Sequence, residues 1–261
     1  MSHFRSLVRI MARLRSENGC PWDQKQTHQT LRPYLVEETY EVLEALERRD
    51  DEDLCEELGD LLLQIIFHAQ IASEENRFDI EDISHAICKK LVRRHPHVFG
   101  DTKVSNADEV LINWEKIKQK EKKRKSQKSI LDSVPQAMPA LLQSYRIQEK
   151  VAQINFDWKE IKEVFAKIYE ELDELGEALK EEDNSKIEEE LGDLLFTIVN
   201  LSRHIQISPE DALRRSNKKF MERFRYMECS LKLKGKSWEQ TTIKELNDLW
   251  NDSKKKETNI E

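Results

Sequence analysis

Carboxylate side chains recur at one spacing in both halves of this 261-residue chain. In the first half, Glu-Glu-x-x-Glu is followed after fifteen intervening residues by Glu-x-x-Asp, and the same array returns 133 positions later. The array consists of Glu37, Glu38, Glu41, Glu57 and Asp60 in the first half, and of Glu170, Glu171, Glu174, Glu190 and Asp193 in the second. A period this long indicates two copies of one domain, because solenoid repeats are shorter.

Four carboxylates of each copy have the spacing of a divalent-cation site. Residues three apart project from the same side of a helix, so each of two neighbouring helices would offer one pair. Two carboxylates about 4 Å apart repel each other by about 4 kcal/mol at an effective dielectric constant near 20, unless a cation joins them. Oxygen ligands without Cys or His favour Mg²⁺ or Mn²⁺ over zinc. The alternative is a solvated or salt-bridged helix face. The candidate ligands are Glu171, Glu174, Glu190 and Asp193 in the second copy, and Glu38, Glu41, Glu57 and Asp60 in the first.

The helices that must hold these carboxylates are amphipathic. Lys167, Glu171 and Glu174 lie on a helical wheel along the edge of an apolar arc. In the next helix, Glu190 and Asp193 border an apolar stripe that we expect to be buried. The arc is formed by Phe165, Ile168, Leu172, Leu175 and Leu179, and the stripe by Leu191, Leu194, Leu195, Ile198 and Leu201. Packing of the two helices would therefore turn the carboxylates toward each other.

Helical periodicity dominates the whole chain and predicts an all-α fold. We expect helices over residues 4–14, 31–48, 53–73, 80–94 and 107–125, and then over 141–153, 159–180, 185–205, 209–233 and 243–256. The very basic stretch from Lys116 to Lys128 is interpreted as a solvated helix end and linker, because no aromatic residue interleaves with its lysines to stack on bases. Trp22 and Trp158 are interpreted as core anchors.

Composition narrows the class of protein further. A formal net charge of −8 argues against nucleic acid as the main partner. No stretch is apolar and long enough to span a membrane, and the first residues lack the apolar core of a signal peptide. The four cysteines are scattered without a C-x-x-C pair, which is typical of reduced thiols in a cytoplasmic protein.

Several segments around the carboxylates resemble the MazG family of nucleoside triphosphate pyrophosphohydrolases. Besides the array itself, the first half resembles that family in residues 19–23 (Gly-Cys-Pro-Trp-Asp), 33–38 and 93–99. The second half resembles it in residues 156–158 (Phe-Asp-Trp), 192–196 and 217–220. Array, duplication and flanking segments together cover nearly the whole chain.

The resemblance implies tandem MazG-type helical domains whose four-helix-bundle cores are completed by dimerisation, and hence a homodimer. The basic stretch, with Pro135 and Pro139 at the entry to the second copy, places the first domain at residues 1–125, a linker at 126–139 and the second domain at 140–261. The resemblance also implies Mg²⁺-dependent hydrolysis of an NTP or dNTP to the monophosphate and pyrophosphate. The cellular task would be clearance of nucleotide pools or control of signalling nucleotides.

The resemblance also assigns roles to residues beside the carboxylates. Lys167, Glu170, Lys219, Arg223 and Trp250 would hold the nucleotide, and Glu170 or Glu171 would orient the attacking water or accept its proton. The corresponding contacts in the first copy are Lys90, Arg94 and Trp114. Basic side chains neutralise triphosphate charge, and a Trp can stack on a base.

One residue distinguishes the two candidate sites. Tyr34 stands where the second copy has Lys167, and a neutral phenol would bind phosphate more weakly than an ammonium group. The second copy is therefore the main catalytic candidate. Two rival interpretations remain at this point: a metal-storing or redox helical bundle, and a non-catalytic scaffold whose glutamates only solubilise its surface.

Overall fold

The structure is a computed structural model that describes residues 2–107, 109–110, 113–114, 117–118, 121 and 129–257. The chain divides into two compact units, Met1–Arg124 and Lys125–Glu261, which are taken one at a time below. Every regular element in the described ranges is helical, so the prediction of an all-α fold is confirmed. None of the helices in those ranges has the length and apolar character needed to cross a membrane.

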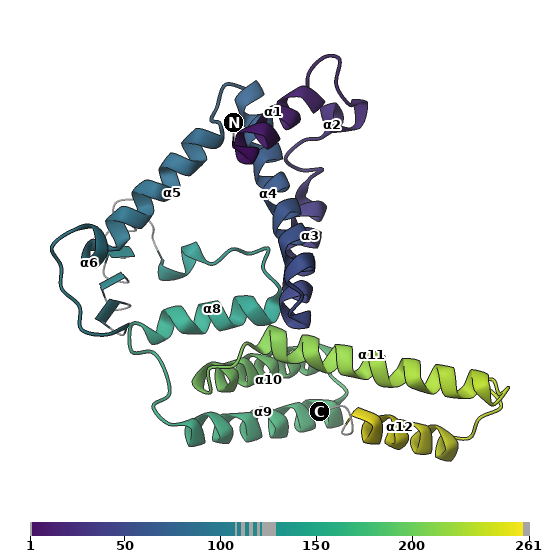
Figure 1. The fold of residues 1–261 in the computed structure, drawn as a ribbon. Helices are drawn as coiled ribbons and strands as arrows, with labels where there is room; N and C mark the ends of the chain where they lie inside the picture. The colour runs from purple at the N-terminus through teal and green to yellow at the C-terminus, as the bar shows by residue number, and fades with distance from the viewer. Residues whose placement is uncertain are drawn as a thin grey trace. The chain divides into compact units, whose positions relative to one another are not determined.

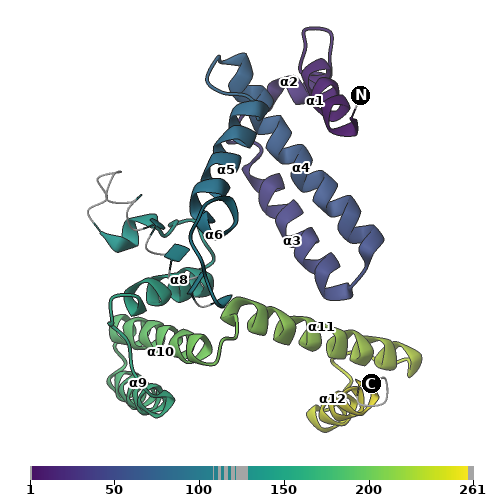
Figure 2. The same ribbon diagram turned by 60° about the vertical axis from the view of Figure 1, so that its left-hand side comes forward.

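The first unit is built on a helical hairpin of α3 and α4, which lie side by side (Figures 1 and 2). Its helices are α1 (His3–Leu14), α2 (Pro21–Lys25), α3 (Arg32–Arg48), α4 (Asp51–Glu74), α5 (Ile80–Arg94) and α6 (Pro96–Phe99). Helix α1 packs on the C-terminal part of α4, where Met11, Leu31, Ile66, Phe67 and Ile71 form the buried core. The core therefore sits at one end of the hairpin, and the carboxylates lie toward the other.

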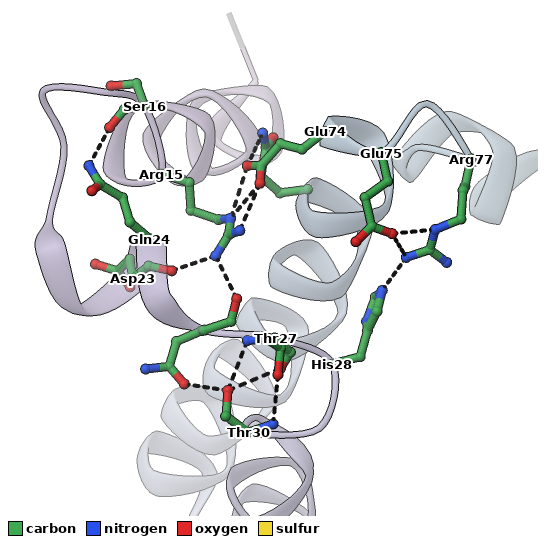
Figure 3. A network of polar contacts seen from close by, with 12 residues as sticks. Arg15, Ser16, Asp23, Gln24, Thr27, His28, Thr30, Glu74, Glu75 and Arg77 are labelled. Carbon is green, nitrogen blue, oxygen red and sulfur yellow. Dashed lines mark hydrogen bonds and ion pairs between the residues drawn. The ribbon is translucent and has the colours of Figure 1, made fainter.

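A buried arginine fastens α1 and the α2 loop to the end of α4 (Figure 3). The guanidinium group of Arg15 donates to the Glu74 carboxylate, with Nη2 2.7 Å from Oε2, and to the carbonyl oxygens of Asp23 and Gln26. This ion pair lowers the pKa of Glu74. Because one planar group satisfies three partners, the loop that leads into α3 is held in one position.

Two histidines form a directed hydrogen-bond chain beside this network. Arg77 Nη2 lies 2.6 Å from His28 Nε2, and His28 Nδ1 lies 2.7 Å from His68 Nδ1 (Figure 3 shows the first of these contacts). Since Arg77 can only donate, His28 Nε2 accepts, and His28 Nδ1–H then donates to His68. His68 Nδ1 is therefore the acceptor at the end of this chain.

The second unit repeats the hairpin with α9 and α10 (Figures 1 and 2). Its elements are the 3₁₀ turn η1 (Ile130–Ser133) and helices α8 (Ala140–Ala152), α9 (Ile161–Glu181), α10 (Asn184–His204), α11 (Pro209–Leu233) and α12 (Ile243–Glu257). Helix α8 packs on α10, and α12 packs on α11 around Met227, Leu231 and Leu249. Figure 2 shows α11 leading away from the hairpin, with α12 against its far part.

The two hairpins turn in the same way. Arg49 and Glu182, each just past the first helix of its pair, have φ of 56° in the left-handed region. The next residue is Asp50 or Asp183, whose carboxylate accepts two backbone N–H groups and caps the second helix. The same local chemistry thus sets the register of the two carboxylate-bearing helices in both copies.

One face of each hairpin is open to solvent, which corrects the expected burial of the apolar stripe. Of that stripe Leu194 is buried, whereas Leu191, Leu195 and Ile198 are exposed. Equivalent positions are exposed in both copies, by between 40% and 56%: Leu46 and Leu179, Leu58 and Leu191, and Ile65 and Ile198. A two-helix layer covers only one side of an amphipathic helix, so a single chain leaves these residues unpacked.

Helix boundaries were predicted more accurately than side-chain burial. The predicted helices over 80–94 and 209–233 match α5 and α11, and the prediction of 31–48 differs from α3 by one residue. The predicted helix over 107–125 lies largely outside the described residues. Trp22 and Trp158, expected in the core, are 51% and 39% exposed, so that interpretation was wrong.

Candidate metal and nucleotide site

Three glutamates converge in the hairpin of the second unit. Glu171 and Glu174 project from α9 and Glu190 from α10, and one oxygen of each lies within 4.8 Å of the others. The side chain of Glu171 is only 5% exposed, whereas Glu174 is partly open to water. Asp193 is not in this group of three, but its charge helps to raise the pKa of Glu190. The cluster is therefore partly buried between the two helices.

Lys167 lies one turn before Glu171 and closes over the cluster. Its Nζ is 2.7 Å from Glu170 Oε1, 2.8 Å from Glu171 Oε1 and 4.0 Å from Glu174 Oε2. Hydrogen bonds to Glu170 and Glu171 raise the pKa of Lys167, so this side chain is charged. Both predicted catalytic residues, Glu170 and Glu171, thus share one ammonium group.

The carboxylates of α10 repel those of α9. Burial raises the pKa of Glu190, and the negative charges of Glu174 and Glu171 raise it further. A raised carboxyl pKa means that the charged form is disfavoured where it stands. The cluster therefore carries more negative charge than Lys167 offsets, which is the electrostatic condition for cation binding.

The first unit gathers the equivalent glutamates with different neighbours. Single oxygens of Glu38, Glu41 and Glu57 lie within 4.8 Å of one another. Burial is the main cause of the raised pKa of Glu38, followed by the charges of Asp60 and Glu41. The pKa of Glu57 is raised as well, by burial and by Glu41. The buried Gln64 places its Nε2 3.4 Å from Glu38 Oε1, a neighbour that sequence analysis missed because a lone Gln in an apolar run gives no functional signal.

Tyr34 contacts an aromatic ring where the second copy has the ion pairs of Lys167. The rings of Trp22 and Tyr34 meet edge to face, with centroids 5.9 Å apart. In this copy an aromatic pair therefore stands at the position that Lys167 has in the other copy.

Three of the predicted nucleotide contacts of the second copy, Lys219, Arg223 and Trp250, lie on α11 and α12, whereas Lys167 and Glu170 lie on α9. The guanidinium carbon of Arg223 is 5.5 Å from the ring centroid of Trp250, and the Phe220 ring is 5.2 Å from it. Lys219 is on α11, one turn before Arg223. Because α12 packs on α11 and not on the hairpin, these residues form a second group within one chain, separate from the carboxylates (Figure 2).

The predicted contacts of the first copy are only partly described. Arg94 Nη2 is 2.5 Å from Glu121 Oε2 and Arg93 Nε is 2.6 Å from Glu121 Oε1, which together lower the pKa of Glu121 to about 2. Lys90 is exposed on α5. Trp114 is also exposed, and the ammonium nitrogen of Lys118 lies 5.1 Å from its ring centroid. Arg94 is therefore committed to an ion pair in this arrangement.

Comparison with known proteins identifies both hairpins. The model of the MazG nucleotide pyrophosphohydrolase domain matches residues 26–99 and again residues 159–227. The chain belongs to the MazG family. The resemblance read from the sequence and the prediction of two MazG-type domains are thereby confirmed, while the domain boundaries at 125 and 139 stay a prediction.

Relatives of the same family are similar over the full chain. A nucleoside triphosphate pyrophosphohydrolase of Escherichia coli K12 is 46% identical over 100% of both chains. A nucleoside triphosphate pyrophosphohydrolase/pyrophosphatase MazG of Thermotoga maritima is 48% identical over 96% of this chain and 95% of its own length. The crystal structure of a mazG-related protein from Thermotoga maritima covers 44% of this MazG chain and 98% of its own, with 31% identity and a TM-score of 0.39.

Proposed function

We propose that this protein hydrolyses nucleoside and deoxynucleoside triphosphates to the monophosphate and pyrophosphate. The observation that carries the proposal is the convergence of three glutamates from two helices in each of two MazG-type copies. Full-length similarity to two proteins named nucleoside triphosphate pyrophosphohydrolases supports it. Removal of unwanted nucleotides, or control of signalling nucleotides, in the cytoplasm is the physiological role that we propose.

The donor set fits a hard divalent cation. Glu171, Glu174 and Glu190 offer three carboxylate oxygens within 4.8 Å of one another, and Asp193 lies one turn after Glu190. Oxygen-only ligands suit Mg²⁺, with Mn²⁺ as a substitute. When bound, the cation would offset phosphate charge and make water more acidic. In the first copy Glu38, Glu41, Glu57 and Asp60 would serve in the same way.

The chain's own side chains would then position the reactants. Lys167, Lys219 and Arg223 would hold the phosphates and offset charge on the departing pyrophosphate, and Trp250 would stack on the base. Glu170 or Glu171 would orient the water molecule or accept its proton. None of the assigned residues is a Ser, Cys or His in a nucleophile's position, so direct attack by water is favoured over a covalent intermediate.

A homodimer would complete both the fold and the site. The apolar positions left open at the same places on both hairpins are the surface that a second helical layer would cover. A second copy would also be able to bring Lys219, Arg223 and Trp250 to carboxylates from which they are separate within one chain. We therefore propose that each site draws on two chains.

Hydrolysis with each NTP and dNTP in the presence of Mg²⁺, followed by detection of pyrophosphate, tests this function. We expect Glu171→Gln to lower kcat by roughly 100-fold or more, because it removes a cation ligand and a candidate base. Glu188→Gln, on an exposed part of the same hairpin, is the matched control and should stay within about twofold of the unchanged protein. Absence of pyrophosphate with Mg²⁺ and also with Mn²⁺ would contradict the proposal and favour a scaffold.

The second copy is proposed as the main catalytic centre because it has Lys167 where the first has Tyr34. Glu38→Gln should therefore cost much less activity than Glu171→Gln. Equal losses would overturn this ranking. Hydrolysis in ¹⁸O-labelled water decides which phosphorus is attacked, since label in pyrophosphate and not in the monophosphate excludes attack at the α-phosphorus.

A further inference from the structure

Lys167 competes for the place that a divalent cation would take in the second copy. Its ammonium nitrogen is 2.8 Å from Glu171 and 4.0 Å from Glu174, two of the three glutamates that converge there. A cation held by these oxygens would therefore lie beside a like charge. Because the side chain of Glu171 is almost fully buried, water and salt would screen this repulsion only weakly.

Lys167 is able to move out of the way. Its side chain is 30% exposed, and lysine carries its charge on a flexible four-carbon stem. Moving away from the cluster breaks the short contact with Glu171, and a movement that also leaves Glu170 breaks a second one. Binding of a cation to the second copy must therefore also break an existing ion pair, which costs free energy.

The first copy contains no such competitor at that position. Tyr34 is neutral and lies against the edge of Trp22, and the neighbour of Glu38 from α4 is the neutral amide of Gln64. Single carboxylate oxygens of Glu38, Glu41 and Glu57 lie within 4.8 Å of one another, so their negative charges repel over short distances. An arriving cation would relieve that repulsion at once.

We propose that Lys167 is a built-in counter-ion that weakens cation binding by the second copy, and that Tyr34 leaves the first copy free to bind the cation alone. The inference rests on the proposed function, because it takes both carboxylate clusters to be cation sites. It goes beyond that function by assigning the two copies different affinities for the same ion. Without nucleotide, the first copy would fill before the second.

Direct measurement of Mn²⁺ binding to the full chain, by electron paramagnetic resonance of the free ion and without nucleotide, tests the proposal. The double variant Glu38→Gln/Glu57→Gln removes two ligands of the first copy, so that binding by the second copy is measured. The double variant Glu171→Gln/Glu190→Gln does the reverse. In the former, Lys167→Tyr should tighten Mn²⁺ binding about tenfold, because it removes a positive charge beside the cation. In the latter, Tyr34→Lys should weaken binding about tenfold for the same reason.

Lys162→Tyr provides the matched control, since Lys162 precedes Lys167 on α9 and its exposed side chain pairs with Glu160 away from the cluster. It should leave Mn²⁺ binding in the second copy unchanged, and circular dichroism verifies that each variant keeps its helices. Measurable binding that does not respond to either exchange, or responds in only one copy, would overturn the counter-ion role while leaving the proposed function intact. Failure of every variant to bind Mn²⁺ would instead contradict the cation sites on which the proposed function depends.

Discussion

At the scale of single residues, the carboxylates are held in a state of mutual repulsion. The pKa of Glu190 is raised by burial and by Glu174 and Glu171, and the pKa of Glu38 and Glu57 is raised by comparable causes. When a carboxyl group has a higher pKa in the folded protein than in the unfolded chain, folding takes up protons. The contribution of that group to stability therefore falls as the pH rises above its pKa in the unfolded chain. The clusters therefore cost stability at neutral pH.

A divalent cation should remove that cost. We expect Mg²⁺ or Mn²⁺ to raise the melting temperature relative to protein in EDTA, and to raise it more at pH 7.5 than at pH 5. The physical reason is that protonated carboxyl groups neither repel each other nor bind the cation. Differential scanning calorimetry at the two pH values measures the effect. An equal shift at both would show that the cation acts elsewhere.

Arg15 illustrates how one side chain fixes several backbone segments. Arg15→Ala should lower the free energy of unfolding by roughly 2–4 kcal/mol, because it removes the guanidinium donor from Glu74 and from two carbonyl oxygens. Arg15→Lys keeps the charge but loses the two-pronged contact, so it should lose part of that amount. Urea unfolding gives the values, with the exposed Arg13→Ala on the same helix as the control. Equal stability of the Ala and Lys variants would show that only the charge matters.

At the scale of the helices, the sequence predicted boundaries well and packing partners poorly. Boundaries follow from local chemistry, such as Asp50 and Asp183 capping the second helix of each hairpin. The convergence of Glu171 with Glu190 also followed from periodicity, because it needs only two amphipathic helices in contact. The solvent exposure of Leu191 and Ile198 could not be predicted from the sequence. Periodicity identifies an apolar face of a helix but not the element that covers it.

Contacts between segments that are distant in the sequence could not be predicted from it either. The pairing of Trp22 with Tyr34, and of Gln64 with Glu38, joins residues whose sequence neighbourhoods carry no sign of each other. The grouping of Lys219, Arg223 and Trp250 apart from the carboxylates depends on where α11 leads, which its own residues do not specify. Motifs thus indicated the candidate residues, whereas the three-dimensional arrangement shows how those residues are grouped.

The histidine chain gives the α2–α3 loop a dependence on pH. Burial, with help from His28, lowers the pKa of His68 in the folded protein. The unfolded chain therefore takes up a proton first as the pH falls, so this contribution to stability is complete above about pH 6.5 and is lost below it.

Unfolding by urea between pH 5.5 and 7.5 tests this expectation. The unchanged protein should lose stability toward the acid end, and His68→Gln should show a smaller slope because the residue can no longer be protonated. His85→Gln, at an exposed position in α5, is the control and should lose stability toward the acid end as the unchanged protein does. Identical slopes for His68→Gln and the unchanged protein would contradict the role of the pair.

At the scale of the whole molecule, the open faces of the two hairpins predict self-association. Leu191→Lys should convert the proposed homodimer into monomers or weaken it at least tenfold, because it would bury a charge in an apolar contact. Sedimentation velocity over a range of concentrations measures the change. Ile243→Lys, at the exposed start of α12, serves as the control. A monomeric unchanged protein, or a dimer that tolerates Leu191→Lys, would contradict the prediction.

The duplication of the hairpin on one chain has a consequence for dosage. Because a single polypeptide carries both copies, a cell makes them in a fixed one-to-one ratio whatever the level of expression. A substitution can then alter one copy while the other keeps its own residue, and the two copies already differ at Tyr34 and Lys167. The two halves can therefore diverge in sequence without any change in their relative amounts. The properties of each half change by substitution within that half and not by separate regulation of two proteins.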